Sequence, residues 1–214
     1  EKGANLNARS INGETPLDLA DLRGHKKTAD FLRAKGAFPK VNQEEFFKAA
    51  ERSDLEKVRA GVFRGLDVNS RDSKNMTPLH FAALSGNVKT AEFLVSHGAL
   101  IDPQNNDGYT PLHAAASKGK TEMVDYLVSK GAATESKSNE GLTPLHVAAE
   151  GGYTDTVSEL ISAKANMNAK TAEDATPLHF ASFRGHDNTV KLLINKGANF
   201  KAQDKRGLTP LDYA

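Results

Sequence analysis

Apolar side chains in residues 105–137 fall into two short groups, each with the spacing of one helix face. The first group is Leu112, Ala115 and Ala116, and the second is Val124, Leu127 and Val128 at i, i+3 and i+4. Such spacing is typical of an amphipathic helix that buries one side. Because alanines allow two backbones to approach closely, the pattern predicts two short helices packed against each other.

Start and stop signals flank both predicted helices. Thr110 is a suitable N-cap, and Pro111 fits the first helical turn, where a backbone N–H needs no partner. Gly131 is typical of the residue that ends a helix in a left-handed conformation. The polar run 136–141 then predicts a turn toward the next segment.

The same pattern recurs along the chain. Thr-Pro-Leu is found at Thr15, Thr77, Thr110, Thr143, Thr176 and Thr209. The last five are separated by 33 residues each time, and a histidine, an alanine pair and Gly-Ala recur around most of them. A single helix pair cannot bury its apolar face alone, so we expect the units to stack.

This pattern resembles the ankyrin repeat, and the resemblance extends over essentially the whole chain. It implies an all-α fold, an α-solenoid of stacked ankyrin repeats in which antiparallel helix pairs are joined by β-hairpin-like fingers. On this basis the chain divides into residues 1–41, a partial repeat end plus one repeat; 42–71, a degenerate repeat; 72–104, 105–137, 138–170 and 171–203, four regular repeats; and 204–214, a truncated repeat.

One stretch of the array is irregular. Thr15 and Thr77 are 62 residues apart, four fewer than two periods, and the pair Ala49 and Ala50 places the deletion within residues 38–43. This register puts Glu44 at the threonine position. The segment before it is too short for a normal finger.

Two arrangements of this stretch are open. In one, residues 1–38 close one array and Asn42 opens another; in the other, a single solenoid continues with a clipped finger. We favour the continuous stack, because Phe46 and Phe47 are unsuited to a free end. Gly61 occupies an outer-helix position that is apolar in other units, and glycine costs about 1 kcal/mol relative to alanine within a helix. We therefore expect this unit to be the weakest.

Composition and charge exclude several classes of function. The 214 residues include no cysteine, which excludes disulfides, cysteine-ligated metal sites and thiol nucleophiles. A net charge of +1 without a basic stripe gives no electrostatic basis for binding nucleic acid. No apolar run approaches the roughly 18 residues that span a bilayer, so no membrane insertion is expected. These residues show no signal peptide either, which favours a cytoplasmic location but leaves the compartment open.

Four of the seven histidines, His80, His113, His146 and His179, share one position of the repeat. The resemblance implies that each ring bonds the threonine of its own unit and nearby backbone. Successive units are about 10 Å apart, whereas histidine ligands lie about 2.0–2.1 Å from a zinc ion. No acid–base pair, catalytic triad or phosphate-binding loop fits the repeat register. We therefore expect no enzyme activity, no metal and no small-molecule cofactor.

Function is expected at the positions that the repeat leaves variable. In the ankyrin family, partners contact the fingertips and the inner-helix surface, so the resemblance implies a protein-binding surface. Its residues are Met76, Leu84, Tyr109, Ser117, Lys118, Leu142, Glu150, Phe183 and Arg184. The proposed anchors are Tyr109, Leu142, Phe183 and Arg184, because aromatic and arginine side chains are frequent hot spots. Packing of Leu142 against a neighbouring unit is the alternative.

The sequence thus predicts a non-catalytic scaffold that binds a protein partner, as a monomer or as part of a longer array. Two alternatives are open. The chain is a structural spacer in a longer ankyrin array of a channel, toxin or cytoskeletal adaptor, or it recruits substrate for an enzyme domain outside these residues. The identity of the partner does not follow from the repeat pattern.

Overall fold

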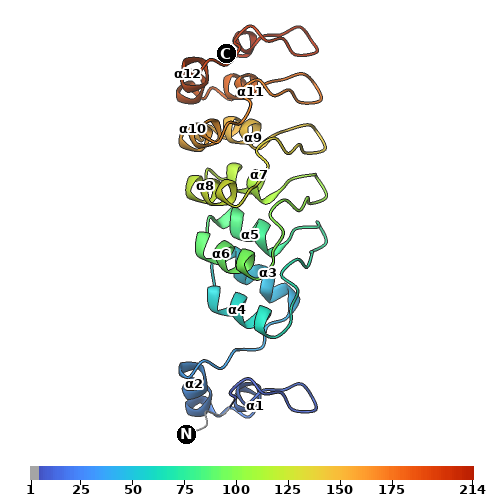
Figure 1. Ribbon diagram of the computed structural model, residues 1–214, viewed down its shortest axis with the longest axis vertical. Helices are drawn as coiled ribbons and strands as arrows, with labels where there is room; N and C mark the ends of the chain where they lie inside the picture. Colours follow the sequence, from blue (N-terminus) through green and yellow to red (C-terminus); the bar gives the residue numbers. More distant parts are fainter. Residues whose placement is uncertain (1–4) are drawn as a thin grey trace.

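The computed structural model describes residues 5–214 as an elongated stack of helix pairs (Figure 1). The elements are α1 (Pro16–Leu22), α2 (Lys26–Ala34), α3 (Gln43–Glu51), α4 (Leu55–Phe63), α5 (Pro78–Ser85), α6 (Val88–Ser96), α7 (Pro111–Ala116), α8 (Thr121–Ser129), α9 (Pro144–Glu150), α10 (Thr154–Ser162), α11 (Pro177–Phe183), α12 (Asp187–Asn195) and the 3-10 helix η1 (Pro210–Tyr213). Residues 5–214 contain no β-strand. The all-α repeat solenoid expected from the sequence is confirmed.

Threonine and proline set the start of the regular inner helices, as predicted. The Thr110 side chain accepts a hydrogen bond from the backbone N–H of His113, and Pro111 is the first helical residue. The same Thr-Pro start is found at Thr15, Thr77, Thr143 and Thr176. An N-cap of this kind contributes about 0.5–2 kcal/mol to stability.

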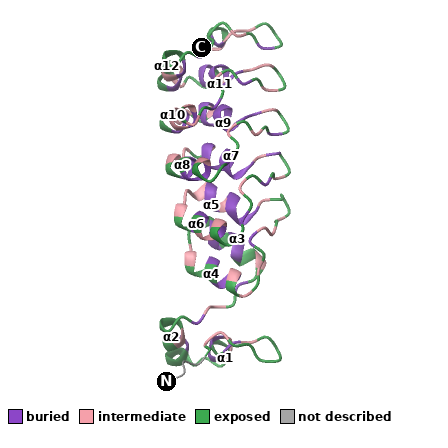
Figure 2. Ribbon diagram, viewed as in Figure 1, coloured by how far each residue is buried: buried purple, intermediate pink, exposed green. Residues whose placement is uncertain are grey.

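The odd-numbered helices form an inner row and the even-numbered helices an outer row (Figure 1). The loops between pairs project to one side as fingers, except for the segment between α2 and α3, which runs on to the next pair (Figure 1). Buried residues follow the helix rows along the stack (Figure 2). Leu112, Ala115, Ala116 and Val124 are fully buried. The side chains at this apolar spacing therefore form the surface through which the helix pairs stack. Burying one leucine side chain there contributes about 1.5–3 kcal/mol to stability.

The apolar core is divided into two clusters. The small cluster consists of Leu17, Ala20, Ala29 and Ala37. The main cluster extends from Val41 to Ala198 and includes Phe46, and the Phe47 ring centre lies 5.6 Å from that of Phe81 in α5. The apolar core is therefore interrupted between Ala37 and Val41, and the continuous stack favoured from the sequence stays a prediction. The phenylalanines of α3 are buried by the helices that follow them in the stack, so they need no cover from α1 and α2.

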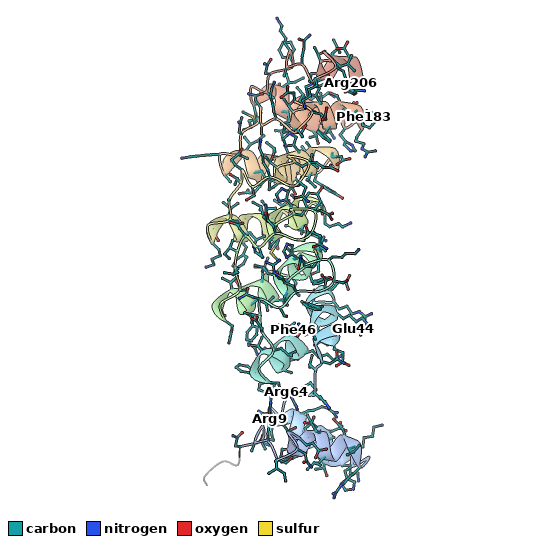
Figure 3. All side chains as sticks on the ribbon, turned by 90° about the vertical axis from the view of Figure 1, so that its right-hand side faces the viewer. Arg9, Glu44, Phe46, Arg64, Phe183 and Arg206 are labelled. Carbon is teal, nitrogen blue, oxygen red and sulfur yellow. The ribbon has the colours of Figure 1, made fainter. Side chains whose placement is uncertain are left out.

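Polar contacts of Arg64 join α1 and α2 to the rest of the stack (Figure 3). Its guanidinium donates to both carboxylate oxygens of Asp18 at 3.0 Å. It also donates to the Thr15 hydroxyl at 3.0 Å and to the Phe38 carbonyl oxygen at 2.7 Å. The Arg9 guanidinium donates to the Arg64 carbonyl oxygen at 2.5 Å. The Arg64 and Asp18 side chains are only 11% and 12% exposed. We call these contacts the Arg64 joint.

The joint follows from the aspartate that replaces histidine in α1. In α7, the His113 ring bonds its own threonine and also donates to the Leu142 carbonyl oxygen of the next pair at 2.9 Å. A carboxylate can only accept hydrogen bonds, so Asp18 caps Thr15 but cannot donate to the chain that follows. Arg64 supplies the missing donors from the other side.

The N-cap of helix α3 lies two residues before the threonine position of the repeat. The register puts Glu44 at that position, but Asn42 is the N-cap, and its side chain accepts a hydrogen bond from the Glu45 backbone N–H at 2.8 Å. No turn is formed in residues 37–42. The helix therefore starts within the segment that forms a finger elsewhere.

Gly61 in α4 makes room for an aromatic ring. A Cβ at Gly61 would lie 2.7 Å from Cδ2 of Phe46 and 3.2 Å from Cδ1 of Leu66. Phe46 stands where the regular inner helices carry the leucine of Thr-Pro-Leu. A larger residue on the inner helix is thus matched by a smaller one on the outer helix, so Gly61 does not leave a void. The low stability expected for this unit stays a prediction.

Candidate protein-binding surface

The four repeat histidines link successive helix pairs. Each Nδ1 lies 2.9 Å from the threonine hydroxyl of its own pair. Each Nε2 lies 2.9–3.1 Å from a backbone carbonyl oxygen 29 residues later. A carbonyl oxygen only accepts, so Nε2 carries the proton and Nδ1 is the acceptor. Burial lowers the pKa of His113 and of His146 to about 4, and both rings are neutral at pH 7. This geometry agrees with the structural role implied by the resemblance.

The fingers are hairpin turns joined side by side. In one of them, the Asn105 N–H donates to the Tyr109 carbonyl oxygen at 3.0 Å, and the Gly108 N–H donates to the Asn105 carbonyl oxygen at 3.1 Å. The next finger is attached through the Asn139 N–H, which donates to the Asp107 carbonyl oxygen at 2.9 Å. Equivalent bonds join the other neighbouring fingers from residue 74 to residue 205. The fingertips therefore form a fixed row, which reduces the entropy lost when a partner binds.

Five of the nine expected surface residues line one cavity of about 330 Å³. They are Met76, Leu84, Tyr109, Ser117 and Glu150, accompanied by His80, Asn105, His113, Ala114 and Val147. Three consecutive helix pairs contribute to it, because Leu84 lies in α5, Ala114 in α7 and Val147 in α9. The Tyr109 ring stands against this wall, with its centre 5.2 Å from that of His113. We call this cavity the Tyr109 groove.

Four of the expected residues lie outside the groove, and two of them are Leu142 and Lys118. Leu142 is only 5% exposed, and its N–H donates to the Ser138 hydroxyl at 3.1 Å. A partner cannot reach this side chain without opening the stack, so the expectation that Leu142 is an anchor is corrected to a packing role. Lys118 is exposed at the end of α7 and does not line the groove.

Phe183 lies toward the C-terminal end of the stack (Figure 3), and Arg184 follows it as the C-cap of α11. Phe183 is 62% exposed. It lines a second cavity of about 210 Å³ together with Ala175, His179, Phe180, Arg206 and Tyr213. The Arg184 guanidinium lies 5.5 Å from the centre of the Phe183 ring and donates to Oε1 of Glu150 at 2.6 Å. Arg184 thus connects the second cavity with the Tyr109 groove.

Three carboxylates act electrostatically on the Tyr109 hydroxyl. Burial raises the pKa of Tyr109, and the nearby carboxylates of Glu140, Glu150 and Asp107 raise it further. The three negative charges act in the same direction, so they disfavour any additional negative charge beside the ring. The groove therefore combines apolar walls with a negative rim.

The sequence matches the family model described as "Ankyrin repeats (3 copies)" over residues 46–138, 100–171 and 145–214. Together these matches cover well over half of the chain. The chain belongs to the ankyrin repeat family. Ankyrin repeats are in general protein-interaction modules, and the family is typically non-enzymatic.

Several curated proteins share parts of this ankyrin array. Protein VAPYRIN-LIKE of Medicago truncatula is 30% identical over 85 residues, which are 40% of this chain and 17% of that protein. Mitochondrial disaggregase of Bos taurus is 30% identical over 105 residues, 46% of this chain and 16% of that protein. Potassium channel AKT1 of Oryza sativa subsp. indica is 45% identical over 56 residues, 26% of this chain and 6% of that protein. The chain thus spans less than a fifth of each of these relatives.

The ankyrin array carries one further variable position that the expected surface omits. It is the residue after the histidine, or after the aspartate of η1, and it is Phe81, Ala114, Val147, Phe180 and Tyr213 in successive units. Ala114 and Val147 line the Tyr109 groove, whereas Phe180 and Tyr213 line the second cavity. The sequence contains a signal for these residues, because this position varies directly beside the constant Thr-Pro-Leu.

In the part of the ankyrin array that the structure describes, histidine, aspartate and glutamate side chains form no group of three or more that could hold a metal ion. None of its helices combines the length and the apolar character needed to cross a bilayer.

Proposed function

We propose that this chain is a non-catalytic scaffold that binds a protein partner through its fingers and inner helices. The anchors are Tyr109, Phe183 and Arg184. One observation carries the proposal: side chains that the repeat leaves variable on three successive helix pairs converge on the Tyr109 groove. The side chains that the repeat fixes are buried or bonded within the stack.

The physical character of these residues supports binding. Tyr109 and Phe183 offer large apolar rings, and Arg184 is held in place by Phe183 and Glu150. Rigid aromatic and arginine side chains lose little conformational freedom on binding and carry much of the energy of many interfaces. The hydrogen-bonded row of fingertips adds a surface that is already ordered.

A photo-crosslinking amino acid tests where the partner binds. It is placed at Leu84 in the Tyr109 groove, and separately at Ile194 on the outer helix α12, in the cells that make this protein. We expect protein adducts at Leu84 and none at Ile194. Adducts at Ile194 alone, or at neither position, contradict the proposal.

The captured protein then allows a quantitative test. Tyr109→Ala combined with Phe183→Ala should weaken its binding by more than about tenfold, the effect of losing at least one hot spot. Leu100→Ala combined with Ile194→Ala is the matched control, because both side chains are exposed and line neither cavity. Circular dichroism checks that all variants fold. Equal affinity of the two double variants overturns the assignment of the anchors.

The spacer alternative has one observation in its favour. The chain matches its curated relatives over only 6–17% of their length, so arrays of this kind occur within much larger proteins. A spacer binds nothing through its fingers and inner helices. In that case the crosslinker at Leu84 captures no separate protein.

A further inference from the structure

Building on the proposed function, we propose that the Tyr109 groove binds a peptide segment of the partner in which an apolar side chain is flanked by lysine or arginine. The apolar side chain enters the groove beside the Tyr109 ring. The basic side chain reaches the carboxylates of Asp107, Glu140 and Glu150.

The floor and walls of the groove fit an apolar side chain. Met76, Leu84 and Val147 face the cavity together with the tyrosine ring, and Ala114 leaves space between them. The volume of about 330 Å³ lies at the lower end of the range of ligand pockets, about 300–1,000 Å³. A groove of this size accommodates one or two side chains and is too small for a folded element.

The two fingertip carboxylates at the rim of the groove form no ion pair among the described residues. Asp107 and Glu140 stand at two adjacent fingertips and are exposed, and the structure pairs neither carboxylate with a lysine or arginine among residues 5–214. The fingertips are held at a fixed separation, because the Asn139 N–H donates to the Asp107 carbonyl oxygen. Glu150 lines the groove at the end of α9.

Charge complementarity therefore selects the partner. Three carboxylates around a half-buried aromatic ring attract a cation and repel a carboxylate or phosphate. An arginine or lysine beside the tyrosine ring gains a cation–π contact as well. Arg184 already donates to one oxygen of Glu150, so the pair at the fingertips, Asp107 and Glu140, supplies most of the free negative charge. The other end of the surface has the opposite character, with Arg184 and Arg206 beside the second cavity.

Selection of peptides from a displayed random library on the purified chain tests this chemistry. We expect the selected peptides to carry lysine or arginine next to an apolar residue and to lose binding when Tyr109 is replaced by alanine. A rim variant that combines Asp107→Asn, Glu140→Gln and Glu150→Gln should weaken a selected peptide by about tenfold or more. The matched control removes three carboxylates from outer helices, with Glu122→Gln, Asp125→Asn and Asp155→Asn, and should leave binding unchanged.

A charge reversal sharpens the test. With Asp107→Lys and Glu140→Lys, the same library should yield acidic peptides in place of basic ones. Peptides that depend on Tyr109 but show no basic residue, or that bind the rim variant as tightly as the wild type, overturn this inference and leave the proposed function intact. Peptides that ignore Tyr109→Ala, or the absence of any selected peptide, contradict both proposals.

Discussion

Arg64 is expected to hold the N-terminal helix pair on the stack almost alone. Replacement by alanine removes the four hydrogen bonds of the guanidinium and leaves the Asp18 carboxylate without its cation. The small cluster around Leu17 cannot stabilise α1 and α2 by itself. One buried leucine contributes about 1.5–3 kcal/mol, whereas ordering each residue costs about 1–2 kcal/mol of conformational entropy. The folded state of the helix pair α1/α2 therefore depends on the contacts of the Arg64 joint.

The size of the effect follows from the burial of the ion pair. Removing one partner of a fully buried pair costs about 3–5 kcal/mol. The Arg64 and Asp18 side chains keep 11% and 12% of their exposure and line an open cavity of about 380 Å³, and the Arg64 Nε is buried without a partner among the described residues. Because the pair is partly exposed, we expect a smaller loss, about 2–3 kcal/mol in the free energy that holds α1 and α2 on the stack. This loss corresponds to a factor of about 30–150 in the equilibrium constant for their opening.

Hydrogen exchange measured residue by residue is the assay. In Arg64→Ala, the amides of α1 and α2 should lose about 30- to 150-fold in protection, while those of α9 and α10 stay within about twofold. Arg59→Ala is the control on the same helix, because Arg59 is half exposed and pairs only with Glu56 at 3.8 Å and the Phe93 ring. Unchanged protection of α1 and α2 in Arg64→Ala refutes the role of the joint.

The pH dependence provides a second reading of the joint. Burial alone raises the pKa of Asp18, but hydrogen bonds from Arg64 and Thr15 outweigh it and hold the pKa below its usual value of 3.8. The stabilisation from Asp18 is therefore complete above about pH 3.8 and is lost as the pH falls through the lower pKa of the folded state. Wild-type α1 and α2 should approach the behaviour of Arg64→Ala in that acid range, and a constant difference down to lower pH contradicts the assignment.

Two further predictions concern the stability of single repeats. Gly61→Leu should lower the free energy of unfolding by about 1–3 kcal/mol through overpacking against Phe46. Addition of Phe46→Leu, which restores the leucine pair of other repeats, should recover at least half of that loss in denaturant titrations; additive losses contradict the proposed exchange of volumes. Lys164 has a φ of +66° at the place where Gly131 has +90°. Lys164→Gly should therefore raise stability by about 1 kcal/mol, and Lys164→Ala should not.

The repeat spacing predicted most of the fold, because it fixes residues whose roles are local. Thr110 and Pro111 start a helix, and His113 bonds within its own pair and to the next backbone carbonyl, irrespective of the rest of the chain. These roles require only that the adjacent unit is another regular repeat. The 33 residues of one repeat are therefore enough to predict its local structure.

The structure departs from prediction where a residue's contacts depend on an adjacent unit that is irregular. Arg64 occupies the same repeat position as His97 and Lys130, which are exposed. Its burial results from two distant changes, the aspartate in α1 and the finger missing before α3. Leu142 shares the position of Tyr109 but is buried. Spacing identifies both positions as variable, but only the packed neighbours decide whether such a side chain faces the partner or the core.

The missing finger before α3 and the Arg64 joint set the N-terminal limit of the binding surface. A continuous binding surface of fingers and inner helices needs a finger in every unit, and residues 37–42 form no turn before α3. The lateral hydrogen bonds between fingers accordingly begin at Lys74, whose carbonyl oxygen accepts from the Asn106 N–H at 3.0 Å. The helix pair α1/α2 has its own finger, but that finger is separated from the row by the missing one and is attached through the Arg64 joint. A partner that spans neighbouring fingers therefore engages the surface from Met76 onward, and loosening the joint should leave its affinity unchanged.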